Sequence, residues 1–485
     1  MLPFRPEQSL LLRPKGPPRY GKSTPAFSRD QFCVNIRLEI TSEDGTPRAA
    51  ADYHVGIPQF SSRKLLDSAS SLVSVVHSPA GPQSSRAPLD IPFRTARNMP
   101  ATTIMGTHQK ICNMDEASLL RHFRRTIGAW LDVSDNERHF SVHAVEIAPS
   151  SSLLLYACLA TAACHLSYTN KSVHPSVADK YHDKCISILL PAVKTINFNI
   201  GIDTILASTV ILRCLEQLSA RSLSQDQQRH ILAGSVYINS HPDCAFAGGL
   251  AEASFWAFVL QDVQCALATR RPLRLTIESL EKGLLPTWEY RSYRTERDWA
   301  HRALWLLAET INYCYGPSTA VHMPSVISDV LKRKICDWEM QRPDIFQPLH
   351  FSPADSSSGR PFPTLWYTST SHAIAVQQIF LAKALIHEHQ SRALHSANKN
   401  RDIKTVQNEI VRNLNIVLGI ALSADDNPPI RIMACHALFA CGSCIYDSPA
   451  RLCILGLLRR SETEDGWSWA SLTLPLSQNG RLTAG

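Results

Sequence analysis

The sequence predicts an all-α protein in which a large, irregular helical domain follows a mostly disordered N-terminal arm. From Met114 onward, apolar residues recur at helical spacing in one segment after another, whereas the alternation typical of strands is scarce after residue 110. The first 110 residues hold thirteen of the thirty prolines and show little helical periodicity. With 485 residues, 44% of them hydrophobic and 19% charged, the chain can bury a large core. We therefore expect an irregular arm over residues 1–110 and an all-helical domain over residues 111–485.

The N-terminal arm is basic and rich in proline and serine. Residues 1–110 hold 14 Lys and Arg against 8 Asp and Glu, a balance of +6, and the remaining residues hold 35 against 34, a balance of +1. This excess is dilute over the arm, so a solvated, disordered segment is a better interpretation than a contact with nucleic acid. Apolar residues alternate with polar ones between residues 34 and 40, before a turn signal at Asp44-Gly45, which predicts a short strand or hairpin near residues 33–45.

The helical domain begins with a one-sided pattern. Asp115 is the expected N-cap of the first helix. Six apolar residues share one face of this helix: Leu119, Leu120, Phe123, Ile127, Trp130 and Leu131. The opposite face carries Arg121, Arg124 and Arg125. Further helices are expected at Leu153–Ser167, Ala178–Val193, Ile205–Leu218, Phe255–Thr269, Trp299–Tyr315, Val321–Trp338, Leu365–His389 and Val406–Ala421.

The last of these segments has the cleanest stripe, and prolines mark the expected breaks between helices. The stripe consists of Val406, Ile410, Leu414, Val417, Leu418 and Ala421, with Gln407, Glu409, Arg412 and Asn413 outside it. Breaks are expected at Pro175, Pro191, Pro242, Pro272, Pro286, Pro317, Pro343 and Pro428-Pro429. The longest polar loop of the domain is expected at Ser352–Pro363.

Cysteine usage and the start of the chain indicate a soluble intracellular protein without a membrane partner. The fourteen cysteines are scattered from Cys33 to Cys453, and most stand inside apolar runs, as buried free thiols do in a reducing compartment. The first residues hold no apolar stretch of signal-peptide length. The apolar run Leu153–Leu166 is shorter than the roughly 20 residues that span a bilayer.

Standard catalytic motifs are missing, so the sequence indicates no enzyme, and we assign no catalytic residue and no cofactor. There is no phosphate-binding loop ending in Lys-Ser/Thr, no Gly-x-Ser-x-Gly elbow, no His-Glu-x-x-His and no dinucleotide fingerprint. A helical enzyme without these motifs would need a polar pocket with paired acid and base groups.

Several His, Cys and Arg groups were weighed as metal or nucleic-acid sites, and none is assigned as one. The metal candidates are Cys435-His436 with Cys441 and Cys444, His139 with His143, His182 with Cys185, and His387 with His389. Each offers too few ligands or stands in an apolar helical run, so core residues are the better interpretation. The densest basic clusters of the helical domain are Arg270, Arg271 and Arg274, and Arg291, Arg294 and Arg297. Neither looks like a helix that reads a DNA groove, so the DNA-binding residues stay unknown.

The helical segments, taken in order, resemble a known family. LLRHFRRTIGAWLDVSDNERHF at 119–140 is followed by LLLYACLATAACHLS at 153–167, YHDKCISILLPAV at 181–193 and ILASTVILRCLEQL at 205–218. The later blocks are FWAFVLQDVQCALATRRPL at 255–273, WAHRALWLLAETINYCYG at 299–316, RIMACHALFACG at 431–442 and LLRRSETEDGW at 457–467. In this order they closely resemble the regulatory middle and C-terminal region of fungal zinc-cluster transcription factors.

The resemblance implies a nuclear transcriptional regulator whose helical domain has no catalytic role. In such proteins this domain is thought to restrain or transmit activation, and to sense a small molecule or a partner. The resemblance also implies promoter DNA as a partner, bound directly or through a partner transcription factor, and a homodimer as one expected assembly. Many such factors control gene clusters of secondary metabolism, which gives the expected target class.

The zinc cluster that reads DNA in this family is missing from residues 1–110. The family's cluster needs six cysteines, because two zinc ions share six thiolates, and these residues hold only Cys33. Zinc is therefore expected only if a missing upstream cluster exists. Three interpretations stay open: an incomplete gene model that lacks the first exon, a co-regulator without a cluster that acts through a DNA-binding partner, and a helical domain reused for another purpose.

Overall fold

The computed structural model describes residues 35–36, 53–54, 111–194, 201–290, 295–317, 324–396, 400–424 and 426–477. Contacts divide the chain into two units, Met1–Met99 and Pro100–Gly485. In the first unit, β1 (Asn35–Ile36) pairs antiparallel with β2 (Tyr53–His54). β1 lies inside the range where the sequence predicts a strand or hairpin, and its partner strand lies beyond that range. The predicted disorder of the arm concerns residues that lie outside the described ones.

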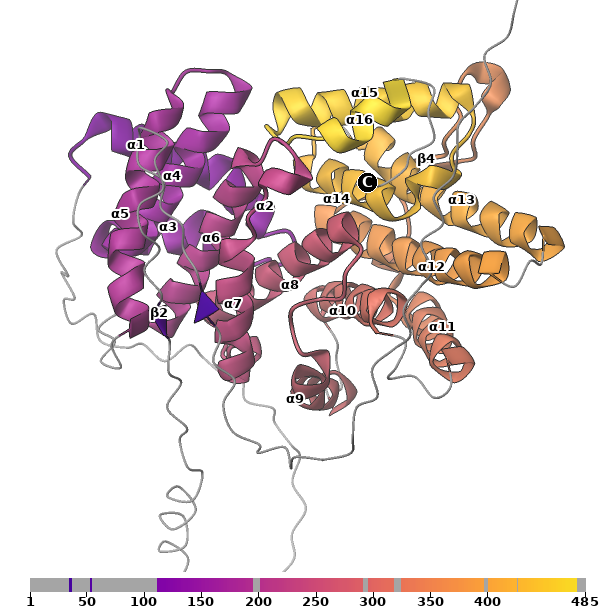
Figure 1. Cartoon of the computed structure of the whole chain (residues 1–485), viewed down its shortest axis with the longest axis horizontal. Coiled ribbons are helices and arrows are strands. Elements are labelled where there is room, and N and C mark those ends of the chain that lie inside the picture. Colours follow the sequence, from indigo (N-terminus) through magenta and orange to yellow (C-terminus); the bar gives the residue numbers. More distant parts are fainter. Residues whose placement is uncertain are drawn as a thin grey trace, which may run out of the picture. The chain divides into compact units, whose positions relative to one another are not determined.

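Helices make up most of the described part of the second unit, as the sequence predicts (Figure 1). The first group of helices is α1 (Met114–Arg125), α2 (Ile127–Leu131), α3 (Ala144–Ile147), α4 (Ser152–Thr169), α5 (Pro175–Lys194), α6 (Ile202–Ser219), α7 (Arg229–Ser240) and α8 (Gly249–Thr269). A π-helical turn, His139–His143, precedes α3. α4 packs against α1, α5 and α6, and α6 packs against α7 and α8.

The second group of helices surrounds α12. It comprises α9 (Ile277–Tyr290), α10 (Glu296–Tyr315), α11 (Pro324–Gln341), α12 (Thr370–Ser396), α13 (Asn400–Ser423), α14 (Pro428–Cys441), α15 (Ser448–Glu464) and α16 (Ala470–Ser477). α12 packs against α10, α13 and α14. α8 joins the two groups, because it packs against α6 on one side and against α10 and α14 on the other.

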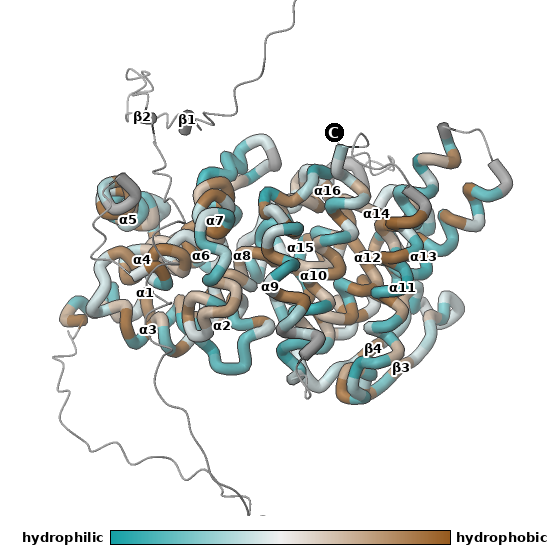
Figure 2. Tube along the Cα trace, turned by 90° about the horizontal axis from the view of Figure 1, so that it is seen from below, coloured by the Kyte–Doolittle hydropathy of each residue, from teal (hydrophilic) through white to brown (hydrophobic). Residues whose placement is uncertain are grey.

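The core is continuous through both groups of helices. Figure 2 shows hydrophobic colour along α4 and α12, which lie among other helices. The largest fully buried side chains include Trp305 of α10 and Trp338 of α11. Cys158, Cys164, Cys214 and Cys314 are all buried, which confirms the prediction that these thiols belong to the core.

α4 is long and apolar enough to cross a membrane by length and composition, and 61% of that window is buried inside the structure. It lies between α1, α5 and α6, and it is apolar on all sides because neighbouring helices cover it. This pattern is typical of a core helix in a large helical protein.

Three local predictions about the helix ends are wrong. The N-cap of α1 is Asn113, whose Oδ1 accepts from the backbone N–H groups of Asp115 (2.8 Å) and Glu116 (3.3 Å). Asp115 instead lies in the first helical turn, where a negative charge is also favourable. Pro191 and Pro286 lie inside α5 and α9 rather than at breaks, each close to the C-terminal end of its helix.

The segment Leu365–His389 does not begin as a helix. Leu365 lies in β4 (Thr364–Trp366), which pairs antiparallel with β3 (His350–Ser352), and α12 starts only at Thr370. The predicted polar loop Ser352–Pro363 is therefore the connection of a β-hairpin. The Asp355 carboxylate accepts from the backbone N–H groups of Ser357 and Ser358 in this loop, and Gly359 takes the left-handed conformation that closes the turn.

Candidate functional site

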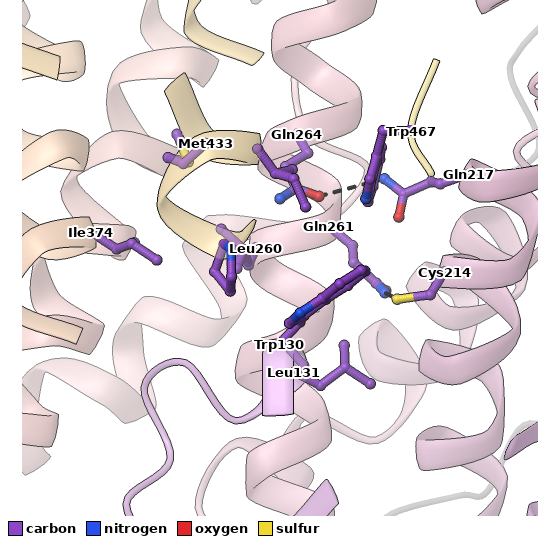
Figure 3. Close-up of a pocket in the computed structure, with 13 residues that line it drawn as sticks. Trp130, Leu131, Cys214, Gln217, Leu260, Gln261, Gln264, Ile374, Met433 and Trp467 are labelled. Atoms are coloured by element: carbon purple, nitrogen blue, oxygen red, sulfur yellow. Dashed lines mark hydrogen bonds between the residues drawn. The ribbon is translucent and has the colours of Figure 1, made fainter. Parts of the chain in front are cut away.

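A small cavity lies where the first group of helices meets the second (Figure 3). Its volume is ≈ 50 Å³, which is room for a few water molecules. α2, α6 and α8 line one side, and α12, α14 and the segment after α15 line the other. We call it the junction cavity; its lining residues are Trp130, Leu131, Cys214, Gln217, Ala257, Leu260, Gln261, Gln264, Ile374, Pro429, Ile432, Met433 and Trp467.

α8 carries polar side chains next to the junction cavity, although neighbouring helices cover α8 on both sides. Gln261, Asp262 and Gln264 are 3%, 1% and 8% exposed. Gln261 and Gln264, one turn apart, point toward α6. Asp262 points elsewhere and accepts from the backbone N–H groups of Arg274 (2.9 Å) and Leu275 (3.1 Å). Burial raises the pKa of Asp262 to about 6.

The glutamines of α6 and α8 use their N–H groups on the protein. Gln261 Nε2 donates to the carbonyl oxygen of Val210 (2.9 Å) and to Cys214 Sγ (3.2 Å). Gln217 Nε2 donates to Gln264 Oε1 at 3.4 Å, and Figure 3 shows this contact beside the Trp467 ring. These bonds fix the orientation of both amides.

Three polar atoms of residues that line the cavity have no hydrogen-bond partner among the described residues. They are Gln217 Oε1, Gln261 Oε1 and Trp467 Nε1, and their side chains belong to residues that are 8%, 3% and 8% exposed. An unmet donor or acceptor at such depth is unfavourable, by about 1–3 kcal/mol. All three atoms are inaccessible to a water-sized molecule, so the structure does not place them on the wall of the junction cavity.

The residues after α15 form a strap that holds the two groups of helices together. We call Asp465–Trp469 the C-terminal strap. Arg221, at the end of α6, donates to the carbonyl oxygen of Gly466 at 3.2 Å, and Ser468 Oγ donates to the carbonyl oxygen of Arg221 at 2.8 Å. Gly466 has a φ of 73°, a conformation that glycine adopts without strain.

A buried ion pair anchors the beginning of the strap. Asp465 is completely buried, and its carboxylate accepts from Arg431 of α14 at 2.9 Å (Nε) and 2.6 Å. This two-bond geometry fixes both side chains. Glu464, which is partly exposed, lies 3.1 Å from the same guanidinium group.

Aromatic rings complete the strap. Trp467 and Trp469 stack with ring centroids 5.9 Å apart and an interplanar angle of 11°. His436 of α14 stands edge-on to both rings and bonds through Nδ1 to the carbonyl oxygen of Ile432 at 2.9 Å. Burial lowers the pKa of His436 to about 4, so the ring is neutral near pH 7.

A second cavity, also of ≈ 50 Å³, lies beside the strap and shares Gln217, Gln264 and Trp467 with the first. Arg213 of α6, which is 1% exposed, reaches it and forms a two-bond pair with Asp226 (2.5 and 2.7 Å) and a contact with Glu216 (2.8 Å). Glu216 also accepts from the backbone N–H groups of Arg229 and His230. This network ties α6 to the start of α7.

A wider surface groove of ≈ 460 Å³ lies between the start of α12 and the turn from α13 to α14. Trp366, Ser369, Asp426 and Asn427 are among its lining residues. Asn427 Nδ2 donates to Thr370 Oγ1 at 2.7 Å across this groove, so part of its polar lining is already satisfied.

The cysteines considered as metal ligands lie in the core. Cys435 and Cys441 are completely buried in α14, and burial raises the pKa of both thiols well above its usual value. Cys185 is also completely buried and donates to the carbonyl oxygen of Leu153. Among the described residues, no three His, Cys, Asp or Glu side chains gather as a metal ion would require.

The His139 and His143 rings lie edge-on to each other with centroids 6.0 Å apart, and other polar groups also contact the histidines considered from the sequence. His139 Nδ1 lies 2.8 Å from Asp135 Oδ2, and His182 lies 3.4 Å from His230 of α7 rather than beside a second ligand. His387 is half-buried, and its neighbour two residues on, His389, contacts the ring of Tyr313.

Two arginines of the basic clusters, Arg270 and Arg297, have structural partners. Arg270 donates to the carbonyl oxygens of Phe439 and Ala440 at the end of α14, and Arg297 pairs with Glu252 of α8. Arg291 and Arg294 lie outside the described residues. Gln217, Gln261, Gln264 and Trp467 were not predicted as site residues from the sequence. The sequence feature that could have indicated Gln261 and Gln264 is their position inside the mostly apolar run FWAFVLQDVQCALA.

The junction cavity has no charged group for acid–base chemistry. All its lining residues are uncharged, so it holds neither a carboxylate nor a cationic group that could exchange a proton with a substrate. Its residues come from both sides of residue 285, and an occupant would contact α6, α8, α14 and the strap at once.

The comparison with protein families identifies the first group of helices. Residues 118–285 match the family described as the fungal specific transcription factor domain. This match runs from α1 into α9 and includes every residue that α2, α6 and α8 contribute to the junction cavity. No similar protein was found among curated proteins or solved structures. The match to the fungal specific transcription factor domain confirms the resemblance seen in the sequence over residues 118–285.

Proposed function

We propose that this chain is a transcriptional regulator that acts in the nucleus. The match of residues 118–285 to the fungal specific transcription factor domain carries this proposal. The family is one of transcription factors and not of enzymes, and the uncharged lining of the junction cavity fits a protein that binds rather than catalyses.

Promoter DNA is the proposed partner, reached directly or through a second DNA-binding protein. Both routes stay open: residues 1–110 hold a single cysteine, Cys33, and six thiolates are needed for a binuclear zinc cluster, so these residues do not supply one. A homodimer is a further proposed assembly. We place no zinc and no DNA contact on any residue of this chain.

The proposed targets are genes of a secondary-metabolite cluster, since many of the regulators that this sequence resembles control such clusters. The proposed role of the helical unit is to restrain or transmit activation. Support for this role comes from the arrangement around α8, where the family domain, α14 and the C-terminal strap meet at one cavity.

Deleting the gene and sequencing all transcripts tests the proposal. A regulator of a cluster changes the level of a group of neighbouring transcripts, and the unchanged gene restores them. Fluorescent tagging of the full chain checks that it enters the nucleus. Unchanged transcripts together with a protein that stays in the cytoplasm would contradict the proposal.

A further inference from the structure

We propose that Ser352 is a phosphorylation site for a protein kinase that recognises serine followed by proline, and that Arg360 binds the phosphate. The site lies in the β-hairpin formed by β3 and β4, away from the junction cavity, and the proposed function assigns no role to it. The inference is carried by the extended, exposed backbone around Ser352-Pro353 and by the contact of Arg360 with the Ser352 hydroxyl group.

The backbone around Ser352 already has the form in which a kinase binds its substrate, since kinases hold the substrate segment extended. Ser352 is partly exposed and is the last residue of β3, so the chain is extended up to it. Phe351 before it and Pro353 and Ala354 after it are exposed. The ring of Pro353 fixes its backbone and removes its N–H group, which is the feature that a proline-directed kinase recognises.

β3 is the outer strand of the hairpin. Its sheet has two strands in the described part of the chain. The other strand, β4, faces α13, because the backbone N–H of Leu365 donates to Ser423 Oγ at 3.1 Å. Figure 2 shows the hairpin at the margin of the helical unit. A kinase can therefore approach the free edge of β3 while the hairpin stays folded.

The guanidinium group of Arg360 is placed to bind a phosphate on Ser352. Its Nη1 donates to Ser352 Oγ and its Nε donates to Ser358 Oγ, each at 3.2 Å. A phosphate on the Ser352 oxygen would turn this contact into a charge-assisted one. The Asp355 carboxylate, 4.0 Å from Nη2 of the same arginine, opposes the phosphate, but water and salt screen charges in an exposed loop.

Two other serines show why Ser352 is the proposed site. Ser358 shares Arg360, but it lies in a 3₁₀ turn, which the backbone bonds between Asp355 and Arg360 close at 2.8 and 2.9 Å. It cannot become extended unless this turn opens. Ser448-Pro449 is the other Ser-Pro pair among the described residues, and it forms the first turn of α15. Its backbone is helical, so it offers a matched control for Ser352.

The reaction transfers the γ-phosphoryl group of ATP. Ser352 Oγ forms a bond to the γ-phosphorus, the bond from that phosphorus to the leaving ADP oxygen breaks, and the hydroxyl proton passes to a carboxylate of the kinase. The product carries a charge of about −1.5 to −2 at pH 7, next to the exposed side chains of Leu349 and Phe351. Phosphorylation would therefore make an apolar strand surface strongly negative.

The test is incubation of the purified full chain with ATP and a mitogen-activated protein kinase, which is proline-directed. Peptide mass spectrometry locates and times each phosphate. Phosphate is expected at Ser352, and Pro353→Ala is expected to slow this reaction about tenfold. Ser448 is expected to react about tenfold more slowly than Ser352, although a free peptide of residues 442–455 should be a substrate. Ser352→Ala confirms the position, and a thermal melt of each variant checks that it is folded.

A second measurement tests the role of Arg360. The ³¹P signal of the phosphate on Ser352 is followed against pH in the phosphorylated chain. The pKa of its second ionisation is expected to be about half a unit lower in the unchanged chain than in Arg360→Gln, because the guanidinium group favours the dianion. Arg412→Gln, which removes an exposed arginine of α13, is expected to leave this pKa unchanged.

Two kinds of result would overturn the inference. One is a Ser352 that is not phosphorylated, or reacts no faster than Ser448, under conditions in which a free peptide of residues 346–358 is phosphorylated; an equal rate in Pro353→Ala has the same meaning. The other is a phosphate whose pKa does not change in Arg360→Gln. Both readouts come from the isolated chain, so such a failure is separate from failure of the proposed function, which the transcripts report.

Discussion

The buried ion pair between Arg431 and Asp465 gives the sharpest test of how the C-terminal strap is held. The two side chains are 2% and 0% exposed and are joined by two hydrogen bonds of 2.9 and 2.6 Å. Asp465→Asn removes the negative charge at nearly constant volume. It leaves the guanidinium group of Arg431 buried, with the carboxylate of Glu464, at 3.1 Å, as the charged group that still contacts it.

The expected loss of stability follows from this geometry. Removing one partner of a buried pair costs about 3–5 kcal/mol, and the remaining contact with Glu464 places the expected loss at the lower end of that range. A loss of about 3 kcal/mol corresponds to a fall in Tm of about 6 °C for a large domain. Urea titration followed by tryptophan fluorescence measures the loss, because Trp467 and Trp469 lie in the strap itself.

Two matched variants separate charge from packing in this experiment. Glu464→Gln changes the partly exposed partner, and the expected loss is below about 1 kcal/mol, as for most exposed ion pairs. The double variant Arg431→Met with Asp465→Leu removes both charges and is expected to recover most of the stability that Asp465→Asn loses. The reasoning is refuted if Asp465→Asn is no less stable than Glu464→Gln.

Three further predictions concern pH, packing and thiol reactivity. The pKa of His436 falls to about 4 on folding from an ordinary value of 6.5, so its stabilising contribution is complete above pH 6.5 and is lost as the pH falls toward 4. His436→Gln is expected to reduce the slope of stability against pH in this window by about 1.4 kcal/mol per unit, as measured by urea titrations at several pH values. Gly234→Ala is expected to destabilise the chain by about 1–3 kcal/mol, because a Cβ there would overlap the ring of Phe258. Gly456→Ala, in an open position of α15, is expected to stabilise the chain by about 1 kcal/mol. Thermal melts measure both effects, and a Gly234→Ala protein as stable as the unchanged chain would contradict the packing. Cys112 and Cys336 are exposed, whereas Cys158 and Cys435 are buried with raised pKa values. Iodoacetamide is therefore expected to label Cys112 and Cys336 in the native chain, and Cys158 and Cys435 only after unfolding. Mass spectrometry reports the order of labelling, and labelling of Cys435 in the native chain would contradict the burial of α14.

The sequence predicts long amphipathic and apolar helices well, because the buried positions of a helix are occupied by apolar residues at regular helical spacing. In α13, Ile410, Leu414 and Val417 are completely buried, as the stripe predicts. Asn413, which was placed outside the stripe, is nevertheless 4% exposed and donates to the carbonyl oxygen of Glu409. A buried polar side chain on a helix can form a hydrogen bond with the backbone of its own helix, and hydrophobic periodicity does not predict such burial.

Short elements, and helices that contain glycine or proline, were not predicted from the sequence for physical reasons. α7 and α9 were not expected, since α7 is short and contains Gly234, and α9 contains Pro286, a residue that usually ends a helix. The sequence predicts a polar loop and the start of a helix where β3 and β4 form a hairpin. Each strand has three residues, too few to show the alternation of apolar and polar residues that predicts a strand.

The candidate site could not be predicted because its parts come together only in the folded chain. Gln217, Gln261 and Trp467 lie on α6, on α8 and in the strap, and no spacing in the sequence relates them. The buried glutamines of α8 were visible as polar residues in an apolar run, but which helix they face depends on the packing of α6 against α8.

The most direct test of the central claim is chromatin immunoprecipitation of the tagged full chain, expressed from its own promoter. If the chain is a transcriptional regulator, it is expected to be enriched at a small set of promoters, and the same genes are expected to change in the deletion strain. Enrichment that disappears when a DNA-binding partner is removed would assign the contact with DNA to that partner. No enrichment above an untagged strain, with unchanged transcripts, would contradict the account.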